Sequence, residues 1–384
     1  MTLLVIFIRQ LGPYHIARFS ELSKVFQVHV IVTRFLSKEY GWEPQDNFPF
    51  AVHNICGKNF DSDPNIFKIF RILGEIRTIN KDIILFVPGW SDFCHYVSFV
   101  YSYIFGLRLI VATDSNFTDC KRNFFYEYIK RSLLMGASGL LSAGTLSKQY
   151  LILLGIPRWK IREPWDVVDN SFFRSQSNLR NLSEKNYILC VSRNLEKKNI
   201  PFLISEYSKY KSNGGICDLV IVGVDTGVSK LMDFCETVDI AKTVQILPFM
   251  QKDNLKELFH GCRLFVLPSV YDQWGLVVNE AMSSGAPCII SERCGCAKDL
   301  IIHNKTGWKF DPYQPGSLYN LLLKSDDFSQ SYLLSIAHAA FLNLENRFTL
   351  RHFKDSVLSL STIPPNRSFR SVLTSILLLL FKRY

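Results

Sequence analysis

The stretch "RLFVLPSVYDQWGLVVNEAMSSGAPCIIS", residues 263–291, contains two short apolar runs on either side of a segment with helical spacing. Its first run predicts a buried strand, residues 269–274 a loop, and the helix begins near Gly275. The run "PCIIS" then predicts a second strand. A strand, a helix and a further strand in this order are typical of a parallel sheet covered by helices.

The loop and the start of this helix carry two carboxylates close to a place where an anion could bind. The first N–H groups of a helix lack internal partners and attract negative charge, and Gly275 has no side chain to obstruct a phosphate. Asp272 precedes that point, and Glu280 follows one to two turns into the helix. The pattern fits a nucleotide with a sugar attached. From the acid spacing alone, the alternative is an ordinary loop and an amphipathic helix.

The same alternation of apolar runs and helical stretches extends along the chain. It begins with "TLLVIFI" and "YHIARFSELSKVF", lapses in a polar Ser/Asn-rich stretch, and resumes at "YILCVSR". We therefore expect an α/β protein with two Rossmann-like, doubly wound parallel-sheet domains facing a cleft. The expected division is a first domain at 1–175, a linker at 176–186, a second domain at 187–345, and a C-terminal helix and tail at 346–384.

The composition describes a globular protein without an export signal. With 384 residues, 48% of them hydrophobic, the chain can form two sizeable cores. The start "MTLLVIFIRQ" has no basic region and too short an apolar run for a signal peptide, so we expect a buried first strand and a cytoplasmic location. The ten cysteines are then expected to be reduced. Cys294 and Cys296 lack the spacing of a zinc site, and no metal or cofactor is expected.

The net charge of +10 is unevenly distributed. Residues 364–384 carry four basic residues and no acidic one: Arg367, Arg370, Lys382 and Arg383. A second basic cluster, "KRNFFYEYIKR", occupies residues 121–131. Basic groups beside aromatic ones suit an anionic membrane surface, whereas no nucleic-acid-binding motif accompanies them. The alternative for either cluster is a solvated helix face.

Two apolar segments raise the question of membrane contact. The run from Val372 to Phe381 is too short to span a bilayer but could lie on its surface, peripheral on the inner face of the membrane. The alternative is a terminal helix packed on the first domain. The stretch 96–112 is interrupted by Gly106 and Arg108, which predicts a helix followed by a strand.

Two further loops supply groups that suit a phosphate ligand. "VSRNLEKKNI" follows a strand and supplies Arg193, Lys197 and Lys198. A departing diphosphate needs positive charge where negative charge develops, and fixed cations provide it. Basic residues that simply face solvent are the alternative. "LVIVGVDTG" adds Gly223 after another strand, where a glycine allows the backbone to approach a ligand; this signal is weak by itself.

Together, these segments resemble the retaining GT-B glycosyltransferases of family 4. The family pattern appears as "SRNLEKKN", "IVGVDTG", "LPSVYDQWGLVVNEAMSSGAPCII" and "NKTGWKF", in order, over nearly all of residues 187–312. The first domain is similar more loosely: "RQLGPYHIARF" places Gly12 where the family has a glycine near the phosphates, and "DVVDNSFF" supplies Asp169. The resemblance implies a GT-B fold with the nucleotide sugar bound by the second domain.

The resemblance also implies roles for individual side chains. Arg193 and Lys198 would hold the donor diphosphate and stabilise its departure. Glu280 would bind the ribose hydroxyls. Asp272 stands where the family has a glutamate that contacts the transferred sugar, so its reach is shorter and the donor identity is open.

Backbone groups are implied in donor binding as well. The N–H groups of Gly275, Leu276 and Val277 would receive the phosphates or the donor sugar. Phe249 and Met250 stand where the family backbone reads the base.

On the acceptor side, the chain departs from the family pattern. Where members often have a histidine, the strand "LRLIVATDS" delivers Asp114 and Ser115. Asp114 could orient or deprotonate an acceptor hydroxyl, or it could be a helix cap or a turn residue. His15 and His95 are further alternatives, each also readable as a packed or surface histidine.

The resulting expectation is a retaining, metal-independent glycosyltransferase in polysaccharide or glycolipid synthesis. Its partners would be a nucleotide diphosphate sugar, a carbohydrate or lipid-linked acceptor and an anionic membrane surface, without nucleic acid. Two alternatives stay open from the sequence: a nucleotide-sugar epimerase of similar fold, and a non-catalytic sugar-nucleotide-binding protein.

Overall fold

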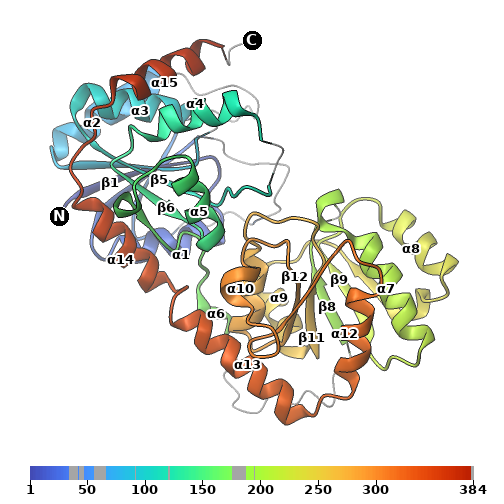
Figure 1. Cartoon of the computed structure of the whole chain (residues 1–384). Coiled ribbons are helices and arrows are strands. Elements are labelled where there is room, and N and C mark those ends of the chain that lie inside the picture. Colours follow the sequence, from blue (N-terminus) through green and yellow to red (C-terminus); the bar gives the residue numbers. More distant parts are fainter. Residues whose placement is uncertain are drawn as a thin grey trace. The chain divides into compact units, whose positions relative to one another are not determined.

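The computed structural model describes residues 1–33, 42, 47–55, 66–90, 92–119, 122–174, 187–193 and 195–381. The chain forms two compact units (Figure 1). Unit 1 comprises Met1–Val167 and Leu350–Tyr384, and unit 2 comprises Val168–Thr349. The chain thus enters unit 2 once and returns to complete unit 1. The expected linker at 176–186, Lys121, and the basic residues Lys382 and Arg383 lie outside the described residues.

Unit 1 contains a sheet of seven parallel strands in the order β3-β2-β1-β4-β5-β6-β7. The strands are β1 (Leu3–Ile8), β2 (Gln27–Val32), β3 (Ala51–Asn54), β4 (Ile83–Pro88), β5 (Arg108–Thr113), β6 (Gly139–Ser142) and β7 (Ile161–Arg162). All six residues of β1 are buried, which confirms the expected buried first strand. Such a strand needs apolar side chains on both faces because helices cover both sides of a parallel sheet.

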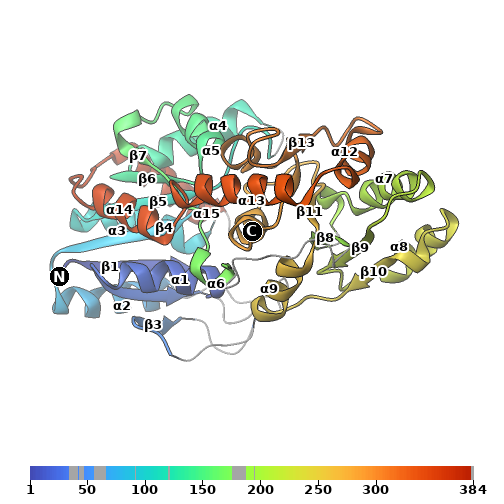
Figure 2. The same cartoon turned by 90° about the horizontal axis from the view of Figure 1, so that it is seen from below.

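Helices cover both faces of this sheet (Figures 1 and 2). They are α1 (Pro13–Leu22), α2 (Ile66–Ile79), α3 (Phe93–Phe105), α4 (Phe124–Leu134), α5 (Thr145–Leu153), a 3-10 turn η1 (Arg158–Lys160), α14 (Leu350–Ser361) and α15 (Phe369–Phe381). α2, α3 and α4 lie on one face, where Leu3, Val5 and Phe7 join their core. α1 and α14 pack together on the opposite face.

Two sequence-based expectations concern the apolar segments of unit 1. The stretch 96–112 forms the end of α3 and most of β5, with Gly106 in the left-handed conformation between them, as expected. The C-terminal run forms α15, which packs on α3 and α4. Of the two alternatives for this run, packing on the first domain is therefore present in the structure.

Unit 2, like unit 1, is built on a parallel sheet. Its six strands have the order β10-β9-β8-β11-β12-β13. The strands are β8 (Tyr187–Val191), β9 (Asp218–Val222), β10 (Val244–Leu247), β11 (Leu264–Leu267), β12 (Cys288–Ser291) and β13 (Trp308–Phe310). This strand order is that of a Rossmann-like, doubly wound sheet, and unit 1 has it too with a seventh strand added. The expected fold class is confirmed.

The helices of unit 2 also lie on both faces of their sheet (Figure 1). They are α6 (Asn170–Phe173), α7 (Ile200–Ser212), α8 (Val228–Thr237), α9 (Lys252–Gly261), α10 (Leu276–Ser283), α11 (Ala297–Leu300), α12 (Ser317–Asp326) and α13 (Gln330–Glu345), with 3-10 turns η2 (Glu196–Lys198) and η3 (Ala241–Thr243). α7, α8 and α12 share one core. α9 and α10 contact each other on the other side.

The boundaries between the units differ from those expected at 175 and 345. The first division falls after Val167, because α6 packs on α10 of unit 2. The Asn170 side chain accepts a hydrogen bond from Ser283 (3.1 Å) and donates one to Glu345 (2.7 Å). These hydrogen bonds connect residues far apart in the sequence, so the sequence does not reveal them. Because of them, the segment from Val168 to the expected linker belongs to unit 2.

Candidate functional site

At the centre of the unit 2 sheet, the order in which the chain adds its strands reverses direction. β8 and β11 are neighbours; β9 and β10 follow on the β8 side, whereas β12 and β13 follow on the β11 side. Loops that leave two such strands diverge, and open parallel sheets bind ligands at this switch point. Arg193 and Lys198 follow β8, and Asp272 follows β11. Three of the predicted site residues therefore lie on the two loops that flank the switch point.

Two contacts join these loops. The Val270 N–H donates to the Lys197 carbonyl (N···O 2.9 Å), and the Lys198 ammonium forms an ion pair with the Asp272 carboxylate. The two paired side chains are 14% and 11% exposed, so they are mostly shielded but still open to solvent. Arg193, on the same loop as Lys198, is half-buried. The structure thus brings together a cation and an acid that are 74 positions apart in the sequence.

A third loop, which follows β12, fixes the backbone of Asp272. The Asp272 carbonyl accepts a hydrogen bond from Gly295 N–H (2.9 Å), and Asp272 forms a parallel bridge with Cys294. Gly295 is required at this point, since a Cβ atom there would lie 1.8 Å from the Gln273 carbonyl oxygen. The sequence interpretation had considered Cys294 and Cys296 only as metal ligands. Their surroundings show that this segment supports the loop of Asp272.

The helix that opens near Gly275 is α10, as expected. Gly275 caps it with φ +101°, a left-handed conformation that favours glycine. Leu276 and Val277 form the first two residues of the helix and are half-buried. Glu280 is the fifth residue and is 2% exposed. The helix start predicted to receive phosphates is therefore present, next to the Asp272 loop.

Trp274 and Asn279 fasten this loop to the helix, and sequence reasoning did not single them out. The Trp274 indole N–H donates to the Asn279 side-chain oxygen (3.0 Å), and its ring packs on Phe348 at 5.2 Å. The signal available in the sequence was a tryptophan directly before the capping glycine. An aromatic side chain of this size fixes the path of a loop when it is buried.

The loops after β9 and β10 contain the other predicted donor-binding residues. Gly223 has φ +97°, and a Cβ atom there would lie 3.3 Å from the Ser192 carbonyl oxygen, so the glycine lets this loop approach the one that carries Arg193. Phe249 and Met250 are half-buried after β10. The Phe249 N–H already donates to the Asp225 carboxylate (2.9 Å). Any contact between this loop and a base would thus involve the Phe249 carbonyl or Met250, and Asp225 is a neighbour that the sequence interpretation missed.

Buried thiols lie beneath the ion pair. Burial raises the pKa of Cys190 to about 12, although Lys198 opposes the shift. Burial and the nearby Asp272 likewise raise the pKa values of Cys294 and Cys296. These groups are protonated near neutral pH, whereas a nucleophile or a metal ligand needs the thiolate. Over the described ranges, no group of three or more His, Cys, Asp or Glu side chains is arranged to hold a metal ion.

In unit 1, Asp114 lies half-buried in the loop after β5. It does not cap a helix, because the next helix, α4, is capped by Asn123. Two hydrogen bonds of this turn are made by neighbouring residues: Thr113 Oγ1 accepts from Ser115 N–H (3.1 Å), and Asn116 Oδ1 accepts from the Thr118 N–H (2.9 Å). The helix-cap alternative for Asp114 is therefore wrong. Its role towards an acceptor stays a prediction.

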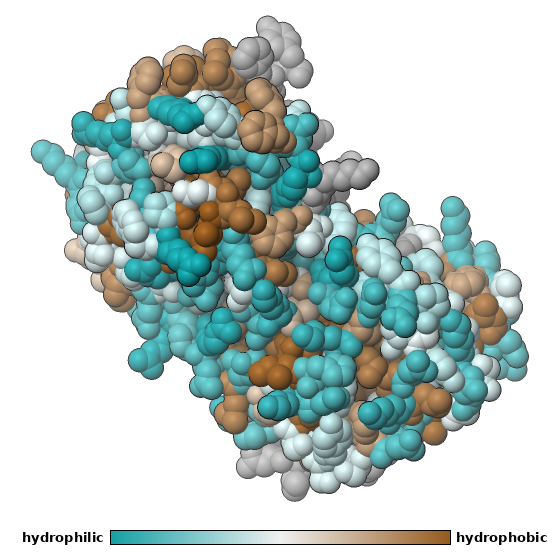
Figure 3. Space-filling view, in the orientation of Figure 1, coloured by the Kyte–Doolittle hydropathy of each residue, from teal (hydrophilic) through white to brown (hydrophobic). Residues whose placement is uncertain are grey.

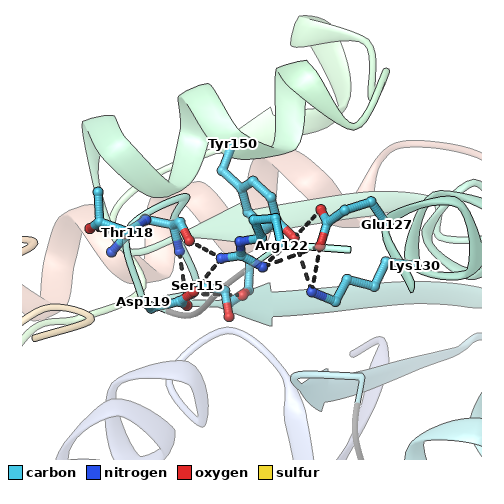
Figure 4. Close-up of polar contacts among 9 residues, drawn as sticks. Ser115, Thr118, Asp119, Arg122, Glu127, Lys130 and Tyr150 are labelled. Atoms are coloured by element: carbon cyan, nitrogen blue, oxygen red, sulfur yellow. Dashed lines mark hydrogen bonds and ion pairs between the residues drawn. The ribbon is translucent and has the colours of Figure 1, made fainter. Parts of the chain in front are cut away.

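A polar cluster fastens the loop of Asp114 to α5 (Figure 4). The Arg122 guanidinium contacts the Asn116 carbonyl and the Asp119 carboxylate, and donates to the Tyr150 hydroxyl (2.8 Å). That hydroxyl donates to Glu127 (2.6 Å). Burial alone would raise the pKa of Glu127, but hydrogen bonds from Tyr150 and Lys130 lower it. The basic cluster read from the sequence is thus partly neutralised.

Gly12 ends the loop after β1 and caps α1, and His15 is the third residue of that helix. A Cβ atom on Gly12 would overlap the Trp42 indole at 2.2 Å, and the Gly12 N–H donates to His15 Nδ1 (3.2 Å). Here the absent side chain makes room for an indole, a structural requirement that the family comparison did not include. Burial and the nearby Arg18 lower the pKa of His15 to about 3. His15 is therefore a neutral, packed side chain, and His95 lies buried near the start of α3.

Arg18 and Asp166 form a second ion pair that the sequence did not reveal. Arg18 lies 3.2 Å from Asp166, donates to the Val167 carbonyl (3.0 Å) and stacks on Trp165 at 4.4 Å. The two side chains are 2% and 7% exposed. Burial lowers the pKa of Arg18, and Asp166 opposes that shift. The pair fixes the last residues of unit 1 before the chain enters unit 2.

The sequence of unit 2 is similar to that of known glycosyltransferases. The model of the family "Glycosyl transferases group 1" matches residues 172–325, which lie within unit 2. These residues are less than half of the chain and are named the group 1 domain after the family that they resemble. The uncharacterized glycosyltransferase MJ1607 of Methanocaldococcus jannaschii is 28% identical over 184 residues, 45% of this chain and 47% of that protein. A sucrose synthase of Solanum tuberosum is 27% identical over 187 residues, 43% of this chain and 23% of that protein.

Solved glycosyltransferase structures share the fold of nearly the whole chain. A glycosyltransferase from Rickettsia africae superimposes with a TM-score of 0.74 at 13% identity, covering 94% of this chain and 98% of that one. Anabaena Alr3699/HepE, in complex with UDP and glucose, gives 0.71 at 16% identity, covering 93% and 98%. Unit 1 and the group 1 domain are therefore the two halves of a GT-B fold. The matches to curated relatives span about half of MJ1607 and about a quarter of the sucrose synthase.

Proposed function

We propose that the chain is a retaining, metal-independent glycosyltransferase that moves a sugar from a nucleoside diphosphate sugar to an acceptor hydroxyl. The Lys198–Asp272 pair at the switch point of the group 1 domain carries this proposal. The ammonium and the carboxylate meet at the two loops that flank the switch point, and α10 begins a few residues after Asp272. Names of similar proteins support the same class, since they include glycosyltransferases and sucrose synthases.

The proposed chemistry assigns each group a task. The bond between the anomeric carbon and the phosphate oxygen breaks, and its electron pair leaves with the diphosphate. Lys198 and Arg193 stabilise that negative charge, together with the N–H groups at the start of α10. These cations supply the charge that a metal ion provides in other enzymes. The acceptor oxygen then bonds to the anomeric carbon from the face that the diphosphate leaves, which retains the configuration.

The same proposal covers the sugar and the acceptor. Asp272 would bind hydroxyls of the transferred sugar and Glu280 those of the ribose. In unit 1, Asp114 would orient the acceptor hydroxyl or take its proton. The solved HepE complexes contain UDP, UDP with glucose, or UDP-glucose, so a uridine diphosphate sugar is the first donor to test. A polysaccharide or lipid-linked acceptor, with the chain peripheral on the inner face of the membrane, fits the basic and aromatic residues of unit 1.

The test compares two adjacent lysines. Lys198→Ala should reduce turnover at least roughly a hundredfold, because one oriented charge at a developing anion contributes on the order of 3 kcal/mol. Lys197→Ala is the matched control, since Lys197 belongs to the same turn but its ammonium lies over the Tyr271 ring at 5.3 Å. A thermal-shift screen with nucleotide sugars first selects the donor, because a ligand of the native state raises the melting temperature.

Three outcomes would contradict the proposal. The first is turnover of folded Lys198→Ala close to that of the unaltered protein. The second is formation of a new sugar nucleotide from the donor alone, which would indicate an epimerase. The third is loss of transfer in the presence of EDTA, which would show that a metal is required. Transfer with retained anomeric configuration, measured by NMR of the product, would support the proposal.

A further inference from the structure

The terminal helix α15 is turned with its large apolar side chains outward. Phe369, Leu373, Ile376, Leu377 and Leu380 lie on one face of the helix and are between 40% and 68% exposed. The inner face, which packs on α3 and α4, carries Ser371 and Ser375, both fully buried, together with the buried Val372 and the half-buried Leu378 and Leu379. The helix therefore carries apolar side chains on its outer face as well as its inner one, whereas a surface helix of a water-soluble protein typically has a single apolar stripe that faces the core.

The contact between α15 and α4 is specific and fixes the orientation of α15. Ser371 Oγ donates to the Leu133 carbonyl of α4 (2.7 Å), and it fills the space beside Gly136, where a Cβ atom would lie 2.2 Å from it. Small residues at such a contact let two helices approach closely, as they do between helices in membranes. This contact fixes the rotation of α15 about its axis, and Phe369, Leu373, Ile376, Leu377 and Leu380 therefore face outward.

The start of α4 presents further exposed aromatic rings. Phe124, Phe125, Tyr126 and Tyr128 are between 47% and 88% exposed. α4 and α15 lie side by side, and the Arg370 guanidinium lies over the Tyr128 ring at 4.6 Å. The two basic and aromatic clusters of the sequence thus meet on one surface, the α4–α15 face. Its α15 side is visible as a row of apolar residues along the upper edge of the molecule in Figure 3.

The charges of the α4–α15 face are positive. Arg131, Arg367 and Arg370 are exposed on these elements. The acid Glu127 on α4 is already paired with Arg122 and Lys130, and residues 364–384 contain no acid. Aromatic and aliphatic side chains between unpaired arginines match a surface that is apolar inside and anionic outside, which describes a bilayer with acidic lipids.

We propose that the α4–α15 face docks on an anionic lipid bilayer, with α15 in the plane of the headgroups. The helix has 13 residues and is about 20 Å long, shorter than the roughly 30 Å of a hydrocarbon core. In the described part of the chain, no helix is long and apolar enough to cross a membrane. Docking within the interface buries the outer side chains of α15, places aromatic rings at headgroup level and adds about 1 kcal/mol for each arginine at the surface.

A second copy of the chain fits this face less well. In a two-fold dimer each patch meets itself, so Arg367, Arg370 and Arg131 would face arginines of the other copy. Like charges across an interface are unfavourable, whereas acidic headgroups neutralise them. The docking proposal deepens the peripheral placement proposed above and rests on it, but its readout is lipid binding and does not depend on sugar transfer.

The experiment measures sedimentation of the full chain with phosphatidylcholine vesicles, with and without phosphatidylglycerol. We expect binding to the anionic vesicles that weakens at high salt, because screening reduces attraction between charges. The variant Leu373→Gln/Ile376→Gln/Leu377→Gln should bind at least tenfold less. The matched control, Ile216→Gln/Ile302→Gln, changes exposed apolar side chains of unit 2 and should bind as the unaltered chain does.

Three results would overturn the docking proposal: no binding to anionic vesicles, equal binding to neutral ones, or equal binding of the outer-face variant. A concentration-dependent dimer that the same variant dissociates would also contradict it and would assign the face to a second copy. Thermal shift with the donor nucleotide sugar is measured on every variant. An unchanged shift in a variant that no longer binds lipid separates failure of docking from failure of the proposed transferase.

Discussion

Two ion pairs, one in each unit, have the same chemistry and different surroundings. Arg18–Asp166 in unit 1 is 2% and 7% exposed, with an indole over the guanidinium and a carbonyl on its Nε. Lys198–Asp272 in unit 2 is 14% and 11% exposed and joins two diverging loops. The first pair is enclosed by its own unit. The second lies on the loops that flank the switch point of its sheet.

Under the proposed function, the difference separates a structural pair from a pair that binds the donor. Removing one partner of an enclosed pair leaves a buried charge without compensation, which destabilises the folded state. A pair that is open to solvent can be hydrated after such a change, and a ligand phosphate can replace the carboxylate as partner of the lysine. Burial, rather than the identity of the charges, should therefore decide whether a substitution affects stability or transfer.

The largest expected effect is on the stability of unit 1. Arg18→Met should lower the free energy of unfolding by about 3–5 kcal/mol, because Asp166 would stay buried and unpaired. Lys198→Met, the matched change in unit 2, should lower it by less, about 1–2 kcal/mol, because its pair is mostly shielded but more exposed than Arg18–Asp166. Urea unfolding of both variants measures the two values. Equal losses would remove the distinction between the pairs.

The next effect is on transfer and concerns the acid of the open pair. Asp272→Asn keeps the shape of the side chain but removes its charge, and should reduce kcat/KM about 10- to 100-fold, the equivalent of one charge-assisted hydrogen bond. Asp166→Asn is the counterpart in unit 1 and should leave the donor-induced thermal shift unchanged while it lowers the melting temperature. The reverse pattern would show that burial does not separate the two roles.

A smaller effect depends on pH and arises beside the enclosed pair. The folded-state pKa of His15, about 3, lies below its ordinary value of 6.5. At acid pH the unfolded chain therefore binds a proton that the folded chain does not, and stability is lost as pH falls from about 6.5 towards 3. We expect His15 to contribute about 1–2 kcal/mol of this loss between pH 7 and pH 5.

Urea unfolding at the two pH values, with His15→Gln as comparison, measures that contribution. Glutamine can still accept the Gly12 N–H but does not titrate, so the variant should lose less stability on acidification. If both proteins lose the same amount, His15 is not the group responsible.

The smallest expected effect tests the polar cluster that holds the Asp114 loop. Tyr150→Phe removes the hydroxyl that bonds Arg122, Lys130 and Glu127, and should cost about 1 kcal/mol of stability. If Asp114 acts on the acceptor, the same variant should raise the KM for the acceptor and leave that for the donor unchanged. An equal change in both KM values would argue against an acceptor role for this loop.

The two units also differ in how far their sequences reveal them. In unit 2 the residues around the switch point were predicted by type and position, because phosphates and sugar hydroxyls accept only a few side chains: cations, carboxylates and a glycine at a helix start. The group 1 family model accordingly matches within this unit. Unit 1 was predicted by its alternation of strands and helices alone, since apolar residues can replace one another in a core. Its ion pair and its division after Val167 were not predicted, and a packed His15 was one of the alternatives that the sequence left open.

The sequence by itself determined the α/β alternation, the capped start of α10 at Gly275 and the residue types of the donor loops. These features depend on neighbours within a few positions, where propensity, capping and turn chemistry act. Only the tertiary structure decided that Lys198 meets Asp272, that Arg18 meets Asp166, and that α4 and α15 share one face. The paired residues are 74 and 148 positions apart, and no local pattern specifies which charge or helix will be its partner. The order of strands in each sheet determines which loops, and therefore which charged residues, lie side by side.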